Sequence, residues 1–171
     1  MEKKMFVIPF RGLKEGEHQF EYIINNTFFE VYQYEDILDA DIKVHLNFLK
    51  KSTLLELSFI TNGEVQVACD ISNELYFQPI EGSLDLVIKF GEEYNNDNED
   101  ILIIPYGDFE IDIAQYIYEM IVLSLPVKKI HPGLIDGTLK TDILDKLEEL
   151  QPNKEQNNKS IDPRWDKLKG L

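Results

Sequence analysis

The amino-acid sequence predicts an α+β fold in which an antiparallel β-meander of about six strands packs on one long buried helix, followed by short C-terminal helices. Segments that alternate apolar and polar residues recur through the N-terminal half of the chain, which is typical of half-buried strands. Residues 109–126 instead carry apolar side chains at the spacing of a helix. With 43% hydrophobic and 29% charged residues, the 171-residue chain has the composition of a globular domain that buries a core.

The predicted central helix covers residues 109–126 and carries a signal at each end. Asp112 suits the N-cap position, because its carboxylate accepts a hydrogen bond from an otherwise unpaired backbone N–H. Pro126 cannot continue a helix. One apolar face is formed by residues three and four positions apart, namely Ile113, Ile117, Met120, Ile121 and Ser124. Because the other sides are largely apolar too, we expect this helix to be buried on several sides.

The predicted strands precede this helix. Their ranges are 5–10, 17–25, 41–49, 53–61, 64–69 and 82–90. Residues 75–79 form a further segment after a polar break, and residues 101–105 form either a last strand or an extended lead-in to the helix. Asn62 and Gly63 lie between two alternating segments, where Asn-Gly is a strong signal for a hairpin turn. Residues 25–34 are predicted to form a loop with a short strand or helical turn. The acidic, Asn-rich segment 92–100 is predicted to be a loop.

The chain changes character after Pro126. Composition divides it into a single α+β domain at 1–150, a polar linker at 151–160 and a C-terminal docking helix at 161–171. A short amphipathic helix at 141–150 closes the domain. Asp162 and Pro163 suit the N-cap and the first position of the docking helix. This helix carries the only tryptophan, Trp165, which favours docking either onto the chain's own body or onto a partner.

The net charge of −15 is unevenly distributed. Residues 1–125 carry 8 Lys and Arg against 24 Asp and Glu, a net charge of −16, whereas residues 126–171 carry 9 against 8, a net charge of +1. An acidic body repels polyanions at long range, which argues against a broad nucleic-acid groove there. The same body either attracts a basic partner or simply presents a solvated acidic surface.

No catalytic constellation is present in the sequence. The three histidines, His18, His45 and His131, lie on separate elements, and none has metal-ligand spacing from the single cysteine, Cys69. Glu119, in the central helix, is interpreted as either an edge-exposed carboxylate or a functional acid. We therefore predict that the protein is not an enzyme and has no metal, cofactor or small-molecule substrate. One cysteine, with no secretory signal and no transmembrane stretch, predicts a cytoplasmic protein without a membrane partner.

Three motifs nevertheless occur together and in order. They are Cys69-Asp70 at a strand end, the segment from Asp112 through Glu119 to Pro126, and Asp162-Pro163-Arg164-Trp165 near the C-terminus. In this combination the chain resembles the YceD family, the large ribosomal RNA subunit accumulation proteins of bacteria and plastids. The resemblance implies a cytoplasmic, non-enzymatic ribosome-biogenesis factor required for synthesis, processing or accumulation of 23S ribosomal RNA.

The chain departs from the family pattern at its cysteines. Many members carry a second cysteine where this chain has Ile71 and Ser72, and others after the position of Pro126, where this chain has His131. Those additional cysteines suggest a metal site in other members. Cys69 and His131 alone do not complete a zinc site, which takes about four ligands, so we expect no metal here.

Two modes of binding are open. In the first, ribosomal RNA or a pre-ribosomal particle contacts the near-neutral C-terminal third, with Trp165 stacking on a base. The basic and histidine side chains available for that contact are Lys128, Lys129, His131, Arg164, Lys167 and Lys169. In the second, the chain is an acidic binding protein or chaperone for a basic large-subunit ribosomal protein, and the terminal helix docks in a groove.

Overall fold

The structure is a computed structural model that describes residues 5–98, 101–140 and 142–150. The chain forms two compact units, residues 1–131 and residues 132–171. We call the first the sheet unit. The second contains α3 (Pro132–Ile135) and α4 (Asp142–Leu150), so the helix predicted at 141–150 is confirmed from Asp142 onward. The predicted linker and docking helix at 151–171 lie outside the described residues.

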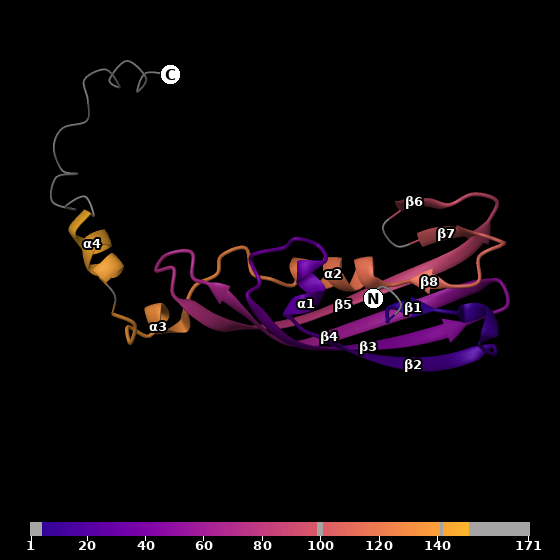
Figure 1. Ribbon diagram of the computed structural model, residues 1–171, viewed down its shortest axis with the longest axis horizontal. Coiled ribbons are helices and arrows are strands. Elements are labelled where there is room, and N and C mark those ends of the chain that lie inside the picture. The colour runs from indigo at the N-terminus through magenta and orange to yellow at the C-terminus, as the bar shows by residue number, and fades with distance from the viewer. Residues whose placement is uncertain (1–4, 99–100, 141, 151–171) are drawn as a thin grey trace, which may run out of the picture. The chain divides into compact units, whose positions relative to one another are not determined.

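The sheet unit is built on a six-stranded mixed sheet with the strand order β2-β3-β4-β5-β7-β6 (Figure 1). Its strands are β2 (Gly16–Ile24), β3 (Asp39–Lys50), β4 (Leu54–Ala68), β5 (Leu75–Gly91), β6 (Asn95–Asn98) and β7 (Ile101–Pro105). β1 (Val7–Ile8) and β8 (Ile111–Asp112) form a separate antiparallel pair. The short helices are η1 (Phe10–Gly12), α1 (Asn26–Glu30) and α2 (Ala114–Leu123).

The predicted antiparallel meander is wrong at its last strands. β7 runs parallel to β5, pairing Val87 with Ile101 and Gly91 with Pro105. The cause is β6, which forms inside the acidic segment that we predicted to be a loop. β6 reverses the chain once, and β7 reverses it again to enter the sheet between β5 and β6. Two reversals leave β7 pointing the same way as β5, and the sheet is therefore mixed.

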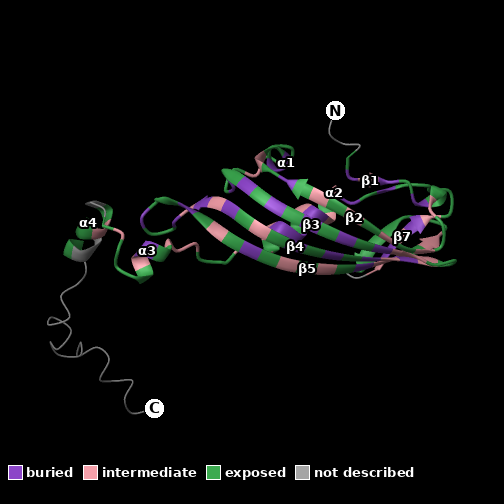
Figure 2. Cartoon of the chain, turned by 90° about the horizontal axis from the view of Figure 1, so that it is seen from below, coloured by how far each residue is buried: buried purple, intermediate pink, exposed green. Residues whose placement is uncertain are grey.

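The core follows the alternation on which the strand predictions depend. On β3, Ile42, Val44, Leu46 and Phe48 are buried while the residues between them are exposed (Figure 2). The buried face carries α1, α2 and the β1–β8 pair, and no described helix of the sheet unit lies on the other face, which we call the open face (Figure 1). The expected half-buried strands are confirmed, because a sheet covered on one side requires a period of two.

The predicted hairpin at Asn62 and Gly63 is wrong, because β4 passes through both residues as one 15-residue strand. Gly63 pairs with Ile42 on β3 and with Ile80 on β5. A Cβ atom on Gly63 would lie 2.7 Å from the Cα atom of Ile42 and against the backbone oxygen of Asp41. The glycine is therefore required by close approach of β3 rather than by a turn.

β5 is likewise continuous across Pro79, although we predicted two segments there. Pro79 pairs with Glu64 of β4, and the pairing of β5 with β7 begins only at Val87. Pro79 thus lies where β5 is an edge of the sheet, so its missing N–H removes no ladder hydrogen bond on that side.

The long central helix is also wrong. α2 spans only ten residues, because Ile111 and Asp112 form β8 and the N–H of Ile113 donates to the carbonyl of Phe6 at 3.0 Å. The predicted inner face is confirmed for Ile113, Ile117, Met120 and Ile121, which are buried, and α2 packs on β5 and β4. Ser124, which was predicted on the same face, is only half-buried. Leu123 is 84% exposed, so α2 is buried on one side and not on several. No described helix has the length and apolar character needed to cross a membrane.

Lys50, at the end of β3, ties η1 and the residue that follows it to the sheet. Its ammonium group donates hydrogen bonds to the carbonyl oxygens of Phe10 (2.9 Å) and Leu13 (2.7 Å).

We expect Lys50→Met to lower the free energy of unfolding by about 2 kcal/mol, because two carbonyl groups lose a charged donor. Lys51→Met, measured by the same urea titration, is the control: its exposed pair with Glu56 contributes less than about 1 kcal/mol. Equal losses would contradict the proposed role of Lys50.

Candidate functional site

Cys69 and Asp70 follow β4 and hold the chain segment that comes after α2. The N–H of Asp70 donates to the carbonyl of Lys129 at 2.8 Å, and the N–H of Lys129 donates to Asp70 Oδ2 at 2.8 Å. The N–H of His131 donates to Cys69 Sγ at 3.3 Å. We call these four residues the Cys69–Asp70 clasp. The structure thus joins one motif of the sequence to part of the predicted binding segment.

The Cys69 thiol is buried and receives several hydrogen bonds. Burial alone raises the pKa of a thiol. Here the hydroxyl group of Ser72 and the backbone N–H groups of Ser72, His131 and Ile71 donate to the sulfur, and together they lower the pKa of Cys69 below its usual value. The sulfur therefore acts as an acceptor that fixes backbone on both sides of the clasp.

Lys129 is oriented by carboxylates. Its ammonium group lies 3.2 Å from Asp36 Oδ2, and its side chain is only 20% exposed. Burial lowers the pKa of Lys129, but Asp36, Asp70 and Tyr34 together raise it above its usual value. Lys128 is exposed, and the His131 ring packs edge-on against Tyr76 at a centroid distance of 5.3 Å. Of the two predicted lysine contacts, Lys128 faces solvent and Lys129 is paired within the protein.

The histidines remain separated in the fold. His18 Nε2 lies 2.8 Å from the carbonyl of Lys14, and His45 Nδ1 lies 3.3 Å from Glu21 Oε1 on the open face of the sheet. His131 approaches Cys69 through its backbone N–H. Within the described ranges, no three His, Cys, Asp or Glu side chains gather in an arrangement that suits a metal ion.

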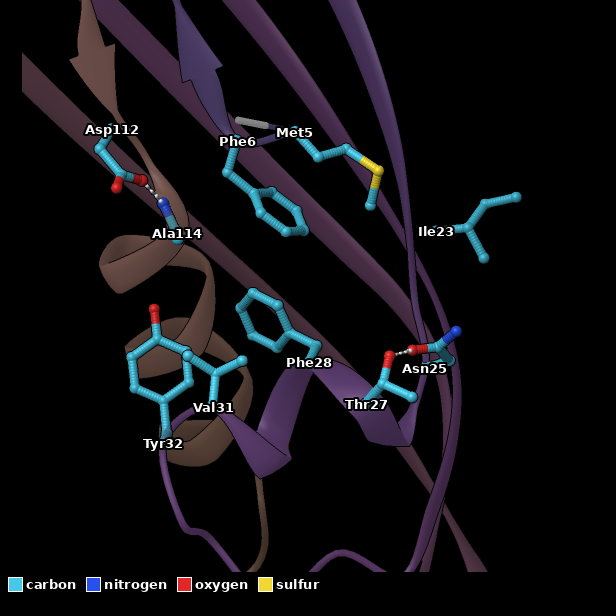
Figure 3. A pocket seen from close by; sticks show the side chains of 10 residues that line it. All are labelled: Met5, Phe6, Ile23, Asn25, Thr27, Phe28, Val31, Tyr32, Asp112 and Ala114. Carbon is cyan, nitrogen blue, oxygen red and sulfur yellow. Dashed lines mark hydrogen bonds between the residues drawn. The ribbon is translucent and has the colours of Figure 1, made fainter. Parts of the chain in front are cut away.

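A second site lies between the N-terminal residues, α1 and the start of α2 (Figure 3). It is a cavity of about 290 Å³ whose lining includes Met5, Phe6, Phe28, Val31, Tyr32 and Asp112. We call it the apolar groove. The Phe28 ring packs against Phe6 at 5.1 Å and against Tyr32 at 5.4 Å. These ring contacts give the groove a rigid aromatic wall.

Of the two carboxylates predicted as motif residues in this region, Asp112 lines the groove and Glu119 lies further along α2. Asp112 was predicted to be the N-cap residue of α2, but the N-cap is Ile113 and Asp112 lies one position before it. Asp112 Oδ1 accepts a hydrogen bond from the N–H of Ala114 at 2.9 Å (Figure 3). Glu119 is exposed, and its Oε1 accepts a hydrogen bond from Gln115 Nε2 at 2.6 Å. Burial first, and then the charges of Asp112 and Glu119 among others, raise the pKa of Tyr32. Both carboxylates thus act on Tyr32, which is one lining residue of the groove.

The comparison with protein families decides the identity of the chain. The family model for the large ribosomal RNA subunit accumulation protein YceD matches residues 57–171, more than half of the sequence. The chain belongs to the YceD family. The resemblance based on three motifs is thereby confirmed, and the family name connects the chain with accumulation of large-subunit ribosomal RNA. No curated protein and no solved structure matched it.

The match to the YceD family includes both described motif sites. The clasp residues, Asp112 and Glu119 lie within it, as does the exposed Pro126 that follows α2. The remaining motif and candidate binding residues also lie within it but outside the described part of the structure; they are Asp162, Pro163, Arg164, Trp165, Lys167 and Lys169.

The residues that sequence reasoning missed are those of the apolar groove, most of which precede the span matched to the YceD family. Residues 25–34 contain Phe28, Phe29 and Val31 without a clear period, and were predicted only as a loop with a short element. α1 buries both phenylalanines but leaves Val31 60% exposed. A short turn cannot bury this many apolar side chains. Their number in residues 25–34 was the signal that could have predicted an exposed apolar surface here.

The clasp makes a direct prediction. Asp70→Ala removes the acceptor of the Lys129 N–H, so we expect hydrogen exchange at the Lys129 and His131 amides to accelerate and the free energy of unfolding to fall by about 1–2 kcal/mol. Asp85→Ala, at an exposed position of β5, is the matched control. Unchanged protection at both amides in Asp70→Ala would show that the carboxylate does not hold the segment.

Proposed function

We propose that this member of the YceD family is a non-enzymatic ribosome-biogenesis factor required for synthesis, processing or accumulation of 23S ribosomal RNA. The family match over residues 57–171 carries this proposal. The site geometry supports a binding role, because the clasp uses its polar atoms to hold backbone, and the apolar groove offers a surface rather than a set of reactive groups.

The proposal is tested in cells that lack the protein. We expect the ratio of 23S to 16S ribosomal RNA to fall and large subunits to be depleted in a sucrose gradient. The wild-type chain supplied from a plasmid should restore both. A normal ratio and a normal gradient in the deletion strain would refute the proposed function.

A second candidate function is binding of a basic large-subunit ribosomal protein. It is supported by the charge of the sheet unit, where residues 1–131 carry 10 Lys and Arg against 24 Asp and Glu, a net charge of −14. Such a surface attracts a basic polypeptide and repels a polyanion. Direct RNA contact through Arg164, Lys167 and Lys169 is the competing mode.

The two modes differ in which charges matter. If RNA is the direct contact, changing Arg164, Lys167 and Lys169 to alanine should abolish co-sedimentation with pre-ribosomal particles. If a basic protein is the contact, that variant should still co-sediment, whereas neutralising carboxylates of the sheet unit should release it.

A further inference from the structure

Several hydrophobic side chains that line the apolar groove are exposed in the described part of the structure. Met5 is 60% exposed, Ile23 is 70% exposed and Val31 is 60% exposed, while Phe6 and Phe28 beneath them are buried. Figure 3 shows Met5, Phe6, Phe28, Val31 and Tyr32 arranged around one hollow. Clustered apolar exposure beside a preformed cavity is typical of a binding surface, whereas single exposed apolar residues are not.

The dimensions of the groove limit what it can hold. Its volume of about 290 Å³ lies just below the range of roughly 300–1,000 Å³ for ligand pockets. It therefore has room for one or two large apolar side chains, and too little for a dinucleotide-sized cofactor. The aromatic contacts of Phe28 with Phe6 and Tyr32 join lining residues of the hollow to one another.

The charges beside the groove favour a partner that carries positive charge. Asp112 lies in the lining. Glu119 follows Tyr118 on α2, and the Tyr118 ring stacks on the lining residue Tyr32 at a centroid distance of 4.1 Å. Among the described residues that line the groove, none is Lys or Arg. The sheet unit as a whole carries −14. A phosphate backbone would be repelled here, and a Lys- and Arg-rich segment would be attracted.

We infer that the apolar groove binds a Lys- and Arg-rich polypeptide segment that inserts a large apolar side chain between Met5, Phe28 and Val31. The basic side chains of that segment lie toward Asp112 and Glu119. This inference rests on the proposed role in ribosome biogenesis, in which basic ribosomal proteins supply segments of this chemistry. It adds to that role the place where the partner binds and the way it is recognised. The apolar side chain supplies affinity, and the carboxylates select a basic partner.

The binding experiment uses the full chain and a fluorescein-labelled peptide of alternating Lys and Arg with one central Phe, followed by fluorescence anisotropy. A second peptide with Ala in place of Phe should bind about tenfold more weakly, because it lacks the anchor. The double variant Met5→Ala and Val31→Ala should weaken binding of the Phe peptide about tenfold and leave binding of the Ala peptide unchanged. Ile60→Ala, at an exposed apolar position on the open face of β4, is the control and should change neither.

A second pair of variants tests the charges. Asp112→Asn with Glu119→Gln keeps acceptors for Ala114 and Gln115 but removes two negative charges, so it should weaken binding and reduce its salt dependence. Glu81→Gln with Asp85→Asn removes the same charge from exposed positions on β5 and should have a smaller effect on both.

Three outcomes would overturn the inference. Equal affinity for the Phe and Ala peptides would mean that attraction is purely electrostatic. A red shift of Trp165 emission in Met5→Ala with Val31→Ala, without peptide, would show that the chain's own C-terminal segment occupies the groove. Binding of a labelled single-stranded RNA that is lost in the same variant would make the groove an RNA site.

The failure of this inference is distinguishable from failure of the proposed function. If neither peptide binds but the deletion strain lacks 23S ribosomal RNA, the groove inference fails and the function stands. If the Phe peptide binds as expected but the deletion strain has a normal ratio of 23S to 16S ribosomal RNA, the groove binds basic segments for another purpose and the proposed function fails.

Discussion

Met120→Asp is expected to lower the free energy of unfolding by about 4 kcal/mol, which is a large part of the stability of a domain of this size. Met120 is only 5% exposed and lies on the face of α2 that packs on β5 and β4. A carboxylate at this position would lose its hydration without gaining a partner, or would have to remain protonated. Urea denaturation followed by circular dichroism measures the effect.

Leu123→Asp provides the matched control on the same helix. Leu123 is 84% exposed, so the same new carboxylate remains in water. Its position in the last turn of α2 is unfavourable for a negative charge, which limits the expected loss to about 1 kcal/mol. If both variants lost the same stability, the burial of α2 on one side only would be incorrect.

Gly63→Ala is expected to cost about 3 kcal/mol, although alanine is usually harmless in a strand. The new Cβ atom would lie 2.7 Å from the Cα atom of Ile42 and against the backbone oxygen of Asp41. Both are main-chain atoms of β3, which is held between β2 and β4 and has little freedom to move aside. The measurement is again the midpoint of urea denaturation, with the slope checked for constancy.

Gly12→Ala is the control, because a Cβ atom on Gly12 would meet no atom within 4 Å. We expect a change within about 0.5 kcal/mol. A harmless Gly63→Ala would show that the close approach of β3 and β4 at this point is not rigid, and that the glycine has another purpose.

Local pattern predicted much of the sheet unit correctly. The alternating residues identified β2 and β3 and the face that each turns toward the core, because a sheet covered on one side selects a period of two. In β4 they identified the inward-facing residues but not the single continuous strand. The inner face of α2 was predicted from the three- and four-residue spacing of Ile113, Ile117, Met120 and Ile121. The motif residues led to the correct family.

The errors arose where contacts between distant residues overruled a local signal. Asn62-Gly63 is a hairpin signal in isolation, but inward-facing apolar residues continue in the same parity from Leu55 to Val67. One strand buries them all, whereas a hairpin would have divided them between two. Segment 109–126 was predicted to be one buried helix, but pairing of β8 with β1 and the hydrogen bond from Ile113 to Phe6 extend the backbone at its start.

The sequence by itself determined the covered face of the sheet, the inner side of α2 and the membership of the YceD family, because each depends on residue type and spacing alone. Tertiary structure alone decided the mixed sheet, the clasp between Asp70 and Lys129, and the apolar groove. These features join residues far apart in the chain, such as Phe6 with Phe28 and Cys69 with His131. The local spacing of apolar residues does not specify which distant segments come into contact. Those contacts depend on the packing of the whole sheet unit.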